Sequence, residues 1–151
     1  MADGDRSQRG NTDMPRVAQL FLKTAIVFLI VGIAIGLHMG ISGDHSAFTA
    51  HAHINLLGWV TSALFGGYYT LNPVKAQRKL AIFQYSVYTL GLLVMLPALY
   101  LKYGANMVSI EPVLAGGSLI VAAGILMFAV VVFSREAENA VLASGSVASR
   151  V

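Results

Sequence analysis

Four stretches of this 151-residue chain contain no Asp, Glu, Lys or Arg, and each is at least 20 residues long. About 20 apolar residues, at a helical rise of about 1.5 Å each, cross the roughly 30 Å hydrocarbon core of a bilayer. The backbone groups of a segment in that core must be paired within the protein, and a helix pairs them locally. The sequence therefore predicts an all-α membrane protein with four transmembrane helices, near residues 20–40, 49–71, 80–101 and 113–134.

The composition supports this fold class and excludes several others. The chain is 56% hydrophobic and 11% charged, whereas a soluble domain carries about 25% charged residues. Neither an ordinary soluble protein nor a disordered one is therefore expected. The chain has no cysteine, which excludes disulfides, thiolate metal sites and covalently attached haem. The sequence also has no nucleophile–base–acid spacing, phosphate loop or dinucleotide fingerprint.

The positions of Lys and Arg predict the orientation in the membrane. Of the ten basic residues, nine precede or begin the first helix, lie in the second connection or follow the fourth helix, and only Lys102 lies near the third connection. Cytoplasmic segments carry the excess of Lys and Arg, so both termini are expected in the cytoplasm. We assign this charge to topology rather than to nucleic-acid binding. The expected domains are a polar tail at 1–19, the four-helix domain at 20–134 and a flexible tail at 135–151.

All four histidines fall within a window of 16 residues around the first, outward-facing connection. Ionisable side chains in a membrane suggest a functional site, and imidazole is a common ligand of metals and of haem iron. The candidate ligands are His53 and His51, then His38, with His45 as a weaker alternative. His51 and His53 point about 200° apart on a helix, so they do not readily chelate one ion together.

The two faces of the second helix differ in character. His51 shares its face with Asn55, Gly58, Ser62 and Gly66, which leaves room for a flat group or for another helix. His53 shares its face with apolar side chains. A second row of small residues, Gly32, Gly36 and Gly40, lies on the first helix. Such rows let helices approach closely in lipid, either within one protomer or between protomers.

The segment HAHINLLGWVTSALFGGYY, residues 51–69, resembles the haem-ligating helices of subunit I of haem–copper oxidases and nitric oxide reductases. His53, Asn55, Leu56 and Leu57, followed by Tyr68 and Tyr69, are similar to a reductase helix whose histidine binds the low-spin haem. His51-Ala52-His53 is similar to a family helix with one histidine facing each of two haems. The resemblance implies a haem b site in the bacterial inner membrane, near the periplasmic face, with His53 as an axial ligand.

The chain also departs from that family. Family members have twelve helices in three arcs of four, and residues 80–101 and 113–134 contain no histidine to match the copper site. A stand-alone oxidase is therefore not expected. Three copies would rebuild a twelve-helix assembly, and closed symmetry is usual in oligomers, so a homotrimer is favoured over a dimer. His53 of one copy and His51 of the next would then hold one haem; other expected arrangements take His38 or His53 of a second copy as the second ligand.

The expected function is thus electron transfer, or haem or gas sensing, by a haem shared between protomers, with a quinol or a redox protein as partner. The cofactor-binding residues are His53, His51, Asn55, Gly58 and Trp59. Two alternatives stay open: a copper or zinc site at the outer face, and a structural or assembly subunit without cofactor. The polar side chains of Gln84, Tyr85 and Tyr88 are expected to bond between helices or to contact haem propionates or a quinone, and Tyr68, Tyr69, Tyr100 and Tyr103 suit the aromatic belt.

Overall fold

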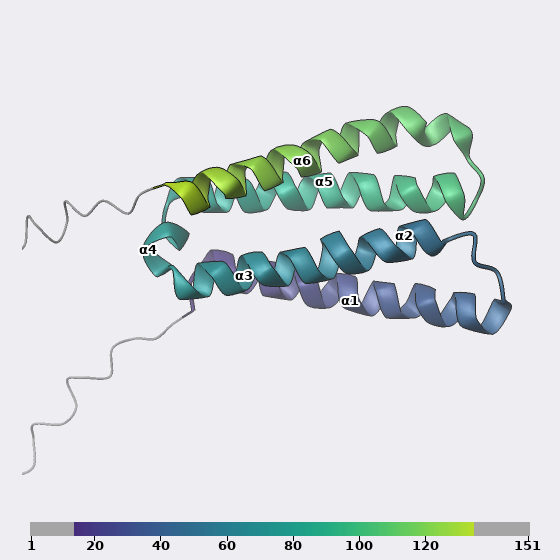
Figure 1. The fold of residues 1–151 in the computed structure, drawn as a ribbon, viewed down its shortest axis with the longest axis horizontal. Coiled ribbons are helices and arrows are strands. Elements are labelled where there is room, and N and C mark those ends of the chain that lie inside the picture. Colours follow the sequence, from purple (N-terminus) through teal and green to yellow (C-terminus); the bar gives the residue numbers. More distant parts are fainter. Residues whose placement is uncertain (1–13, 135–151) are drawn as a thin grey trace, which may run out of the picture.

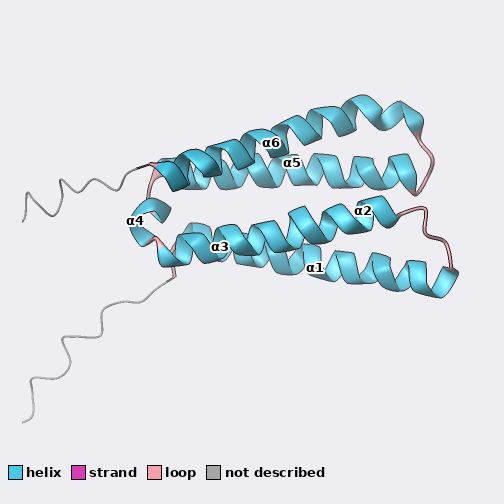
Figure 2. Cartoon of the chain, in the orientation of Figure 1, coloured by secondary structure: helices cyan, strands magenta, loops and turns pink. Residues whose placement is uncertain are grey.

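The computed structural model describes residues 14–134 and shows two antiparallel helical hairpins packed side by side (Figures 1 and 2). In that part of the chain the secondary structure is helical, without strands. The first hairpin pairs α1 (Arg16–Ser42) with a second helical segment made of α2 (Phe48–His53), η1 (Ile54–Thr61) and α3 (Ser62–Leu71). The short α4 (Pro73–Ala76) leads into the second hairpin, which pairs α5 (Lys79–Tyr103) with α6 (Glu111–Phe133) after the turn η2 (Val108–Ile110).

Within residues 14–134, three helical segments are long and apolar enough to cross a membrane: Arg16–Ser42, Lys79–Tyr103 and Val108–Phe133. The fourth expected helix is present as continuous helical structure from Phe48 to Leu71, but the π-helix η1 divides it into shorter pieces. The first helix begins four residues earlier than the sequence predicted, so residues 16–19 belong to α1 and not to a tail. The expected tail at 135–151 lies outside the described residues.

Local chemistry explains where the helices end. Gly43 adopts a left-handed conformation with φ of 70° and donates its N–H to the Met39 carbonyl, which closes α1. Pro112 follows Glu111 in the first turn of α6, where its missing N–H costs no helical hydrogen bond. Lys102 at the end of α5 pairs with Glu111 at 2.7 Å and joins the two helices across their connection.

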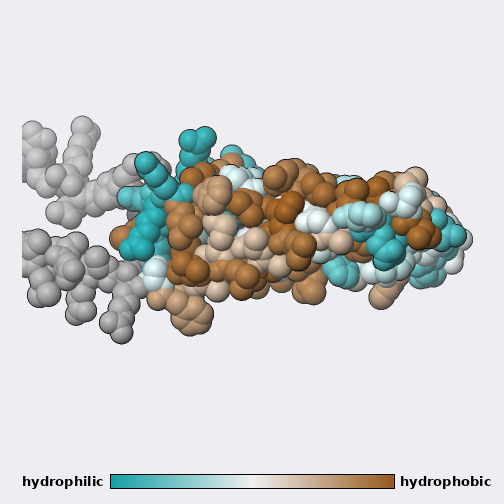
Figure 3. All heavy atoms as spheres, turned by 90° about the horizontal axis from the view of Figure 1, so that it is seen from above, coloured by the Kyte–Doolittle hydropathy of each residue, from teal (hydrophilic) through white to brown (hydrophobic). Residues whose placement is uncertain are grey.

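One end of the bundle carries both ends of the described chain together with α4, and the other end carries the connections 43–47 and 104–110 (Figure 1). Apolar side chains cover the middle of the face seen in Figure 3, and hydrophilic ones gather toward both ends. This is the distribution that a membrane-embedded bundle requires.

A cluster of aromatic rings joins the two hairpins in the half of the bundle near α4. Phe65 of α3 lies 4.0 Å from Phe128 of α6, and Phe21 of α1 lies 4.9 Å from Tyr85 of α5, between ring centroids. Tyr69 is fully buried in this core, so its assignment to the aromatic belt is wrong: it packs against Phe21 and donates its hydroxyl to Gln84.

Interhelical hydrogen bonds hold the polar side chains of α5. The Gln84 amide donates to the Gly124 carbonyl of α6 at 3.2 Å, and Tyr88 donates to the Leu57 carbonyl of η1 at 2.9 Å. Tyr85 bonds Thr24 of α1 at 3.0 Å. These bonds confirm that the side chains of Gln84, Tyr85 and Tyr88 connect helices.

Candidate functional site

The four histidines lie at the same end of the bundle but in different environments. His38, near the end of α1, and His45, in the following connection, are both exposed. The His45 ring bonds the Gly43 carbonyl through Nδ1 at 2.9 Å. His51 and His53, at the end of α2, are half-buried. The four histidines therefore form two pairs, one exposed to solvent and one partly covered by protein.

Asp44 shapes the connection between α1 and α2. Its carboxylate accepts the Ser46 N–H at 2.9 Å, which starts the turn into α2. That backbone bond holds the pKa of Asp44 below its usual value, with further contributions from the Ser46 hydroxyl and from the nearby His38 and His45. The Asp44 carboxylate therefore serves as a hydrogen-bond acceptor that stabilises the turn.

The His51 ring lies in a space that two glycines of α1 leave open. Its Nδ1 is 3.0 Å from the Gly32 carbonyl oxygen, and a Cβ added to Gly36 would lie only 2.9 Å from the ring carbon Cε1. The Asn55 amide donates to the His51 carbonyl at 2.9 Å and lies 3.3 Å from Nε2 of the ring. His51 therefore faces α1 within its own chain.

His53 is held differently, by its own helix. Its Nδ1 lies 2.9 Å from the Thr49 carbonyl oxygen, one turn earlier. Because a carbonyl oxygen only accepts, Nδ1 carries a proton, and in the neutral ring the lone pair is therefore on Nε2. An ideal helix places its side chain about 200° from that of His51 around the axis, so His53 does not share the His51 contact with α1.

The face of His51 is occupied by another helix and not by a flat group. Gly58 lies against the Phe28 ring, Gly32 against the Asn55 carboxamide, and Gly66 against Leu22, where added Cβ atoms would come within 2.9 Å of those side chains. These small residues therefore serve contacts within one chain. Gly40 is the exception, because a Cβ there would meet no atom of residues 14–134 within 4 Å.

A porphyrin has no space between η1 and α1, since the two helices are in contact there. The His53 side fits a haem better: the ring is half-buried, its Nδ1 is fixed and its Nε2 is unbonded among the described atoms. Asn55 and Gly58 support the contact with α1, and Trp59 is half-buried on η1.

The structure does not assemble a metal site from carboxylates and imidazoles of one chain. Across residues 14–134, no three His, Asp, Glu or Cys side chains come together in positions that could hold an ion. The outer-face copper or zinc site considered from the sequence would need His38, Asp44, His45 and His51 to converge. Instead the first three lie on the exposed connection and its helix end, and His51 packs on α1.

The π-helix η1 begins directly after His53. Its wider turn leaves carbonyl groups that side chains then satisfy: Thr61 donates to the Leu56 carbonyl at 2.8 Å, and Tyr88 of α5 donates to the Leu57 carbonyl at 2.9 Å. π-Turns inside helices are frequent at functional sites. This one sets the register between the histidine pair and the rest of the second helical segment.

Two features of the structure have no counterpart in the sequence predictions. Lys75 of α4 is buried and donates to the Tyr68 hydroxyl and to the Val132 carbonyl, both at 3.0 Å, so it caps the end of α6. A groove between α1 and α5 is lined by several hydroxyl-bearing side chains. The sequence signal for the groove was Tyr85 and Thr89, one helical turn apart on a helix that also carries the polar residues Gln84, Ser86 and Tyr88.

Searches for similarity found no matching family model, no matching curated protein and no matching solved structure. The function is therefore argued from the geometry of the histidine pair and the arrangement of the helices.

Proposed function

We propose that this chain is a four-span protein of the bacterial inner membrane that binds a b-type haem through His53 and serves electron transfer. The helical segment Phe48–Leu71 supplies the fourth span, because its 24 residues extend about 36 Å at helical rise. With Lys75, Arg78 and Lys79 at the α4 end, that end and both termini lie in the cytoplasm. The histidines then lie toward the periplasm.

One observation carries the haem proposal: the Nδ1 of the half-buried His53 imidazole is bonded to the Thr49 carbonyl oxygen, whereas the Nε2 of His51 lies within hydrogen-bond distance of the Asn55 amide. Metal-ligating histidines commonly donate their second ring N–H to such an acceptor, which fixes the tautomer and directs Nε2 to the metal. Imidazole is also among the protein ligands that hold haem iron.

The second axial ligand comes from a neighbouring copy. Within one chain His51 and His53 point to opposite sides of the helix, and the His51 ring lies against α1. A second imidazole beside His53 would be supplied by another protomer, through His53 or His38 of that copy because the His51 ring packs against α1, in a closed assembly for which we favour three copies. A haem with imidazoles on both faces exchanges single electrons and has no open position for oxygen.

The test is a dithionite-reduced minus oxidised spectrum of the full chain, purified in detergent after expression with added haem precursor. We expect a low-spin b-type spectrum that His53→Ala abolishes. His45→Ala is the matched control, because that imidazole is also bonded through Nδ1 to a carbonyl but lies on the exposed connection. It should keep the spectrum.

Three results would contradict the proposal. A protein with no Soret band despite supplied haem excludes the cofactor. Loss of the band in His45→Ala but not in His53→Ala excludes the ligand assignment. A full low-spin spectrum on a particle of one 16.0 kDa chain excludes a haem shared between copies.

A further inference from the structure

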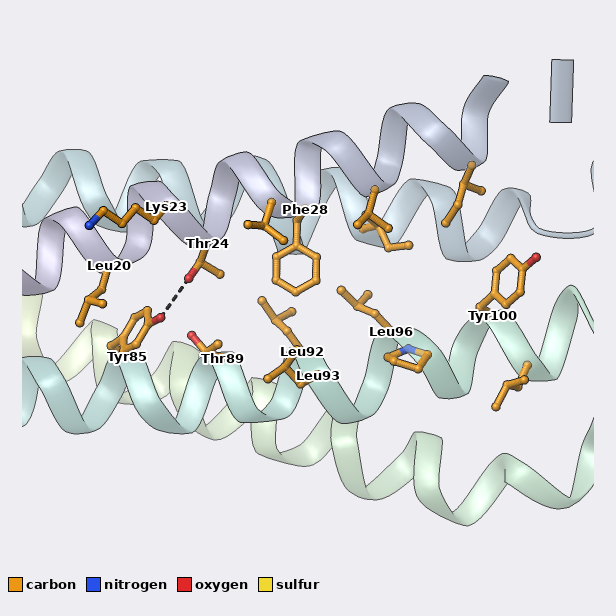
Figure 4. Close-up of a pocket in the computed structure, with 16 residues that line it drawn as sticks. Leu20, Lys23, Thr24, Phe28, Tyr85, Thr89, Leu92, Leu93, Leu96 and Tyr100 are labelled. Carbon is orange, nitrogen blue, oxygen red and sulfur yellow. Dashed lines mark hydrogen bonds between the residues drawn. The ribbon is translucent and has the colours of Figure 1, made fainter. Parts of the chain in front are cut away.

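A groove with a volume of 690 Å³ runs between α1 and α5 on one side of the bundle (Figure 4). Most of its lining is apolar, including Phe28 of α1 and Leu92, Leu96 and Pro97 of α5. Lys23 lies near its cytoplasmic end in the proposed topology, and Tyr100 lies toward the other end (Figure 4). The groove is therefore a long apolar slot with polar groups in its cytoplasmic half.

Three hydroxyl groups line that half of the groove. Thr24 and Tyr85 are 3.0 Å apart and share one hydrogen bond, as the dashed line in Figure 4 shows. Two hydroxyls have two protons, so one O–H of this pair remains free to donate. Thr89 lies one helical turn beyond Tyr85, about 6 Å along α5.

Two buried hydroxyls of the described residues, those of Ser62 and Thr89, have no hydrogen-bond partner, and of the two only Thr89 lines the groove. A buried hydroxyl normally has a partner, because desolvation without one is unfavourable. In the hydrocarbon core water does not supply it, so an atom of a groove occupant is the candidate partner of Thr89.

The occupant must carry acceptor oxygens at bilayer depth. A phospholipid chain fills an apolar slot but has its oxygens near the interface, whereas Thr89 is ten residues into α5, about 15 Å along the helix. A helix of a second copy would offer only the second lone pair of a helical carbonyl, as Leu57 offers to Tyr88. A molecule with two free carbonyl oxygens fits two hydroxyl donors one turn apart in an apolar slot better than either.

We propose that the groove binds a lipid-soluble quinone, a flat ring with two carbonyl oxygens and an apolar tail. One carbonyl accepts the Thr89 hydroxyl and the other accepts the free O–H of the Thr24–Tyr85 pair. The Phe28 ring flanks the head, and the tail follows Leu92, Leu96 and Pro97. This inference rests on the proposed function, because a quinol is a membrane-soluble electron donor and the proposed haem would be its acceptor.

The experiment measures binding of a decyl-substituted benzoquinone to the full chain in lipid nanodiscs by equilibrium dialysis against empty nanodiscs. The wild-type chain should take up quinone in excess over the empty discs. Thr89→Val removes the hydroxyl at nearly constant volume and should weaken this binding about fivefold. The matched control is Thr70→Val, because Thr70 is exposed on α3 and bonded to the Gly66 carbonyl.

A second pair of variants tests the other carbonyl. Tyr85→Phe should weaken binding severalfold, whereas Tyr103→Phe, on the same helix but exposed outside the groove, should leave it unchanged. Leu93→Trp should block uptake, since Leu93 lines the groove and is 60% exposed, which leaves room for the larger ring without repacking the core.

The outcomes separate this proposal from the haem proposal. His53→Ala should bind quinone like the wild type, and Thr89→Val should keep the haem spectrum. Uptake equal to empty discs, with a phospholipid retained on the chain in mass spectrometry, would assign the groove to lipid and overturn the proposal. Absence of uptake together with a smaller assembly in Leu93→Trp would assign it to a second copy. Unchanged binding in both Thr89→Val and Tyr85→Phe would also overturn it.

Discussion

The two hairpins use glycine for different purposes. In the second hairpin Gly91, Gly117 and Gly124 face the backbone of the partner helix: a Cβ at Gly91 would lie 2.7 Å from the Val121 nitrogen, and a Cβ at Gly117 would lie 2.8 Å from the Met95 nitrogen. In the first hairpin the glycines of α1 face side chains instead. Gly32 lies against the Asn55 carboxamide and Gly36 against the His51 ring.

This difference in what the glycines face suggests that the second hairpin is a scaffold and that the first hairpin carries the candidate site. Backbone contact between α5 and α6 gives the closest packing that two helices in lipid can reach. In the first hairpin the glycines of α1 leave space for the His51 imidazole and the Asn55 carboxamide. The helical segment that carries these two side chains contains the π-helix η1. The regular hairpin supports the irregular one, because the Tyr88 hydroxyl of α5 satisfies a carbonyl of η1.

The largest expected effect breaks the scaffold. Gly117→Ala should lower the free energy of unfolding by about 1–3 kcal/mol, because the new methyl group overlaps the α5 backbone, which cannot move aside without separating the helices. The measurement is an unfolding titration in mixed detergent micelles, followed by far-UV circular dichroism.

Gly116→Ala is the matched control in the adjacent position. A Cβ there would meet no atom of the described chain within 4 Å, and alanine favours the helix over glycine. The free energy of unfolding should stay the same or rise by up to about 1 kcal/mol. Equal losses in both variants would show that α5 and α6 are not in backbone contact.

The second prediction concerns the bond between the hairpins. Tyr88→Phe should cost about 1 kcal/mol, because it removes the hydroxyl that satisfies the Leu57 carbonyl in a buried π-turn. Tyr103→Phe, exposed at the end of α5, should change little. If Tyr88→Phe were neutral in the same titration, the scaffold would not support η1.

The sequence predicts the helices well because their signal is physical and local. Stretches without charge place each helix within a few residues of its observed bounds. The row of Gly58, Ser62 and Gly66 correctly marks a face that another helix covers. These inferences need only periodicity and the length of a bilayer.

The features that the sequence leaves out depend on contacts between distant segments. A carbonyl of the π-turn accepts a hydrogen bond from α5, thirty-one residues away. No local sequence pattern predicts this bond. Lys75 is buried because α4 folds it onto the end of α6, although a lysine in a short connection is typical of a solvated surface. His51 and His53 differ in burial partners for the same reason: only packing decides which one faces α1.

The smallest expected effect tests the space that α1 leaves for the site. Gly36→Ala places a methyl group 2.9 Å from His51 Cε1, but here the obstacle is the end of a side chain, which shifts more easily than a backbone. The loss in free energy of unfolding should therefore be below about 1 kcal/mol. The ring is bonded to the Gly32 carbonyl, so moving it costs free energy. In the His51→Ala background there is no ring to move, and Gly36→Ala should cost less there. The double-mutant cycle of the two substitutions should therefore give a coupling energy of at least about 0.5 kcal/mol. Gly40→Ala, whose Cβ would have open space around it within residues 14–134, should show no coupling to His51. If the effects of Gly36→Ala and His51→Ala were additive, the ring would not occupy this space. The glycines of the first hairpin would then not differ from those of the second by making room for the His51 side chain.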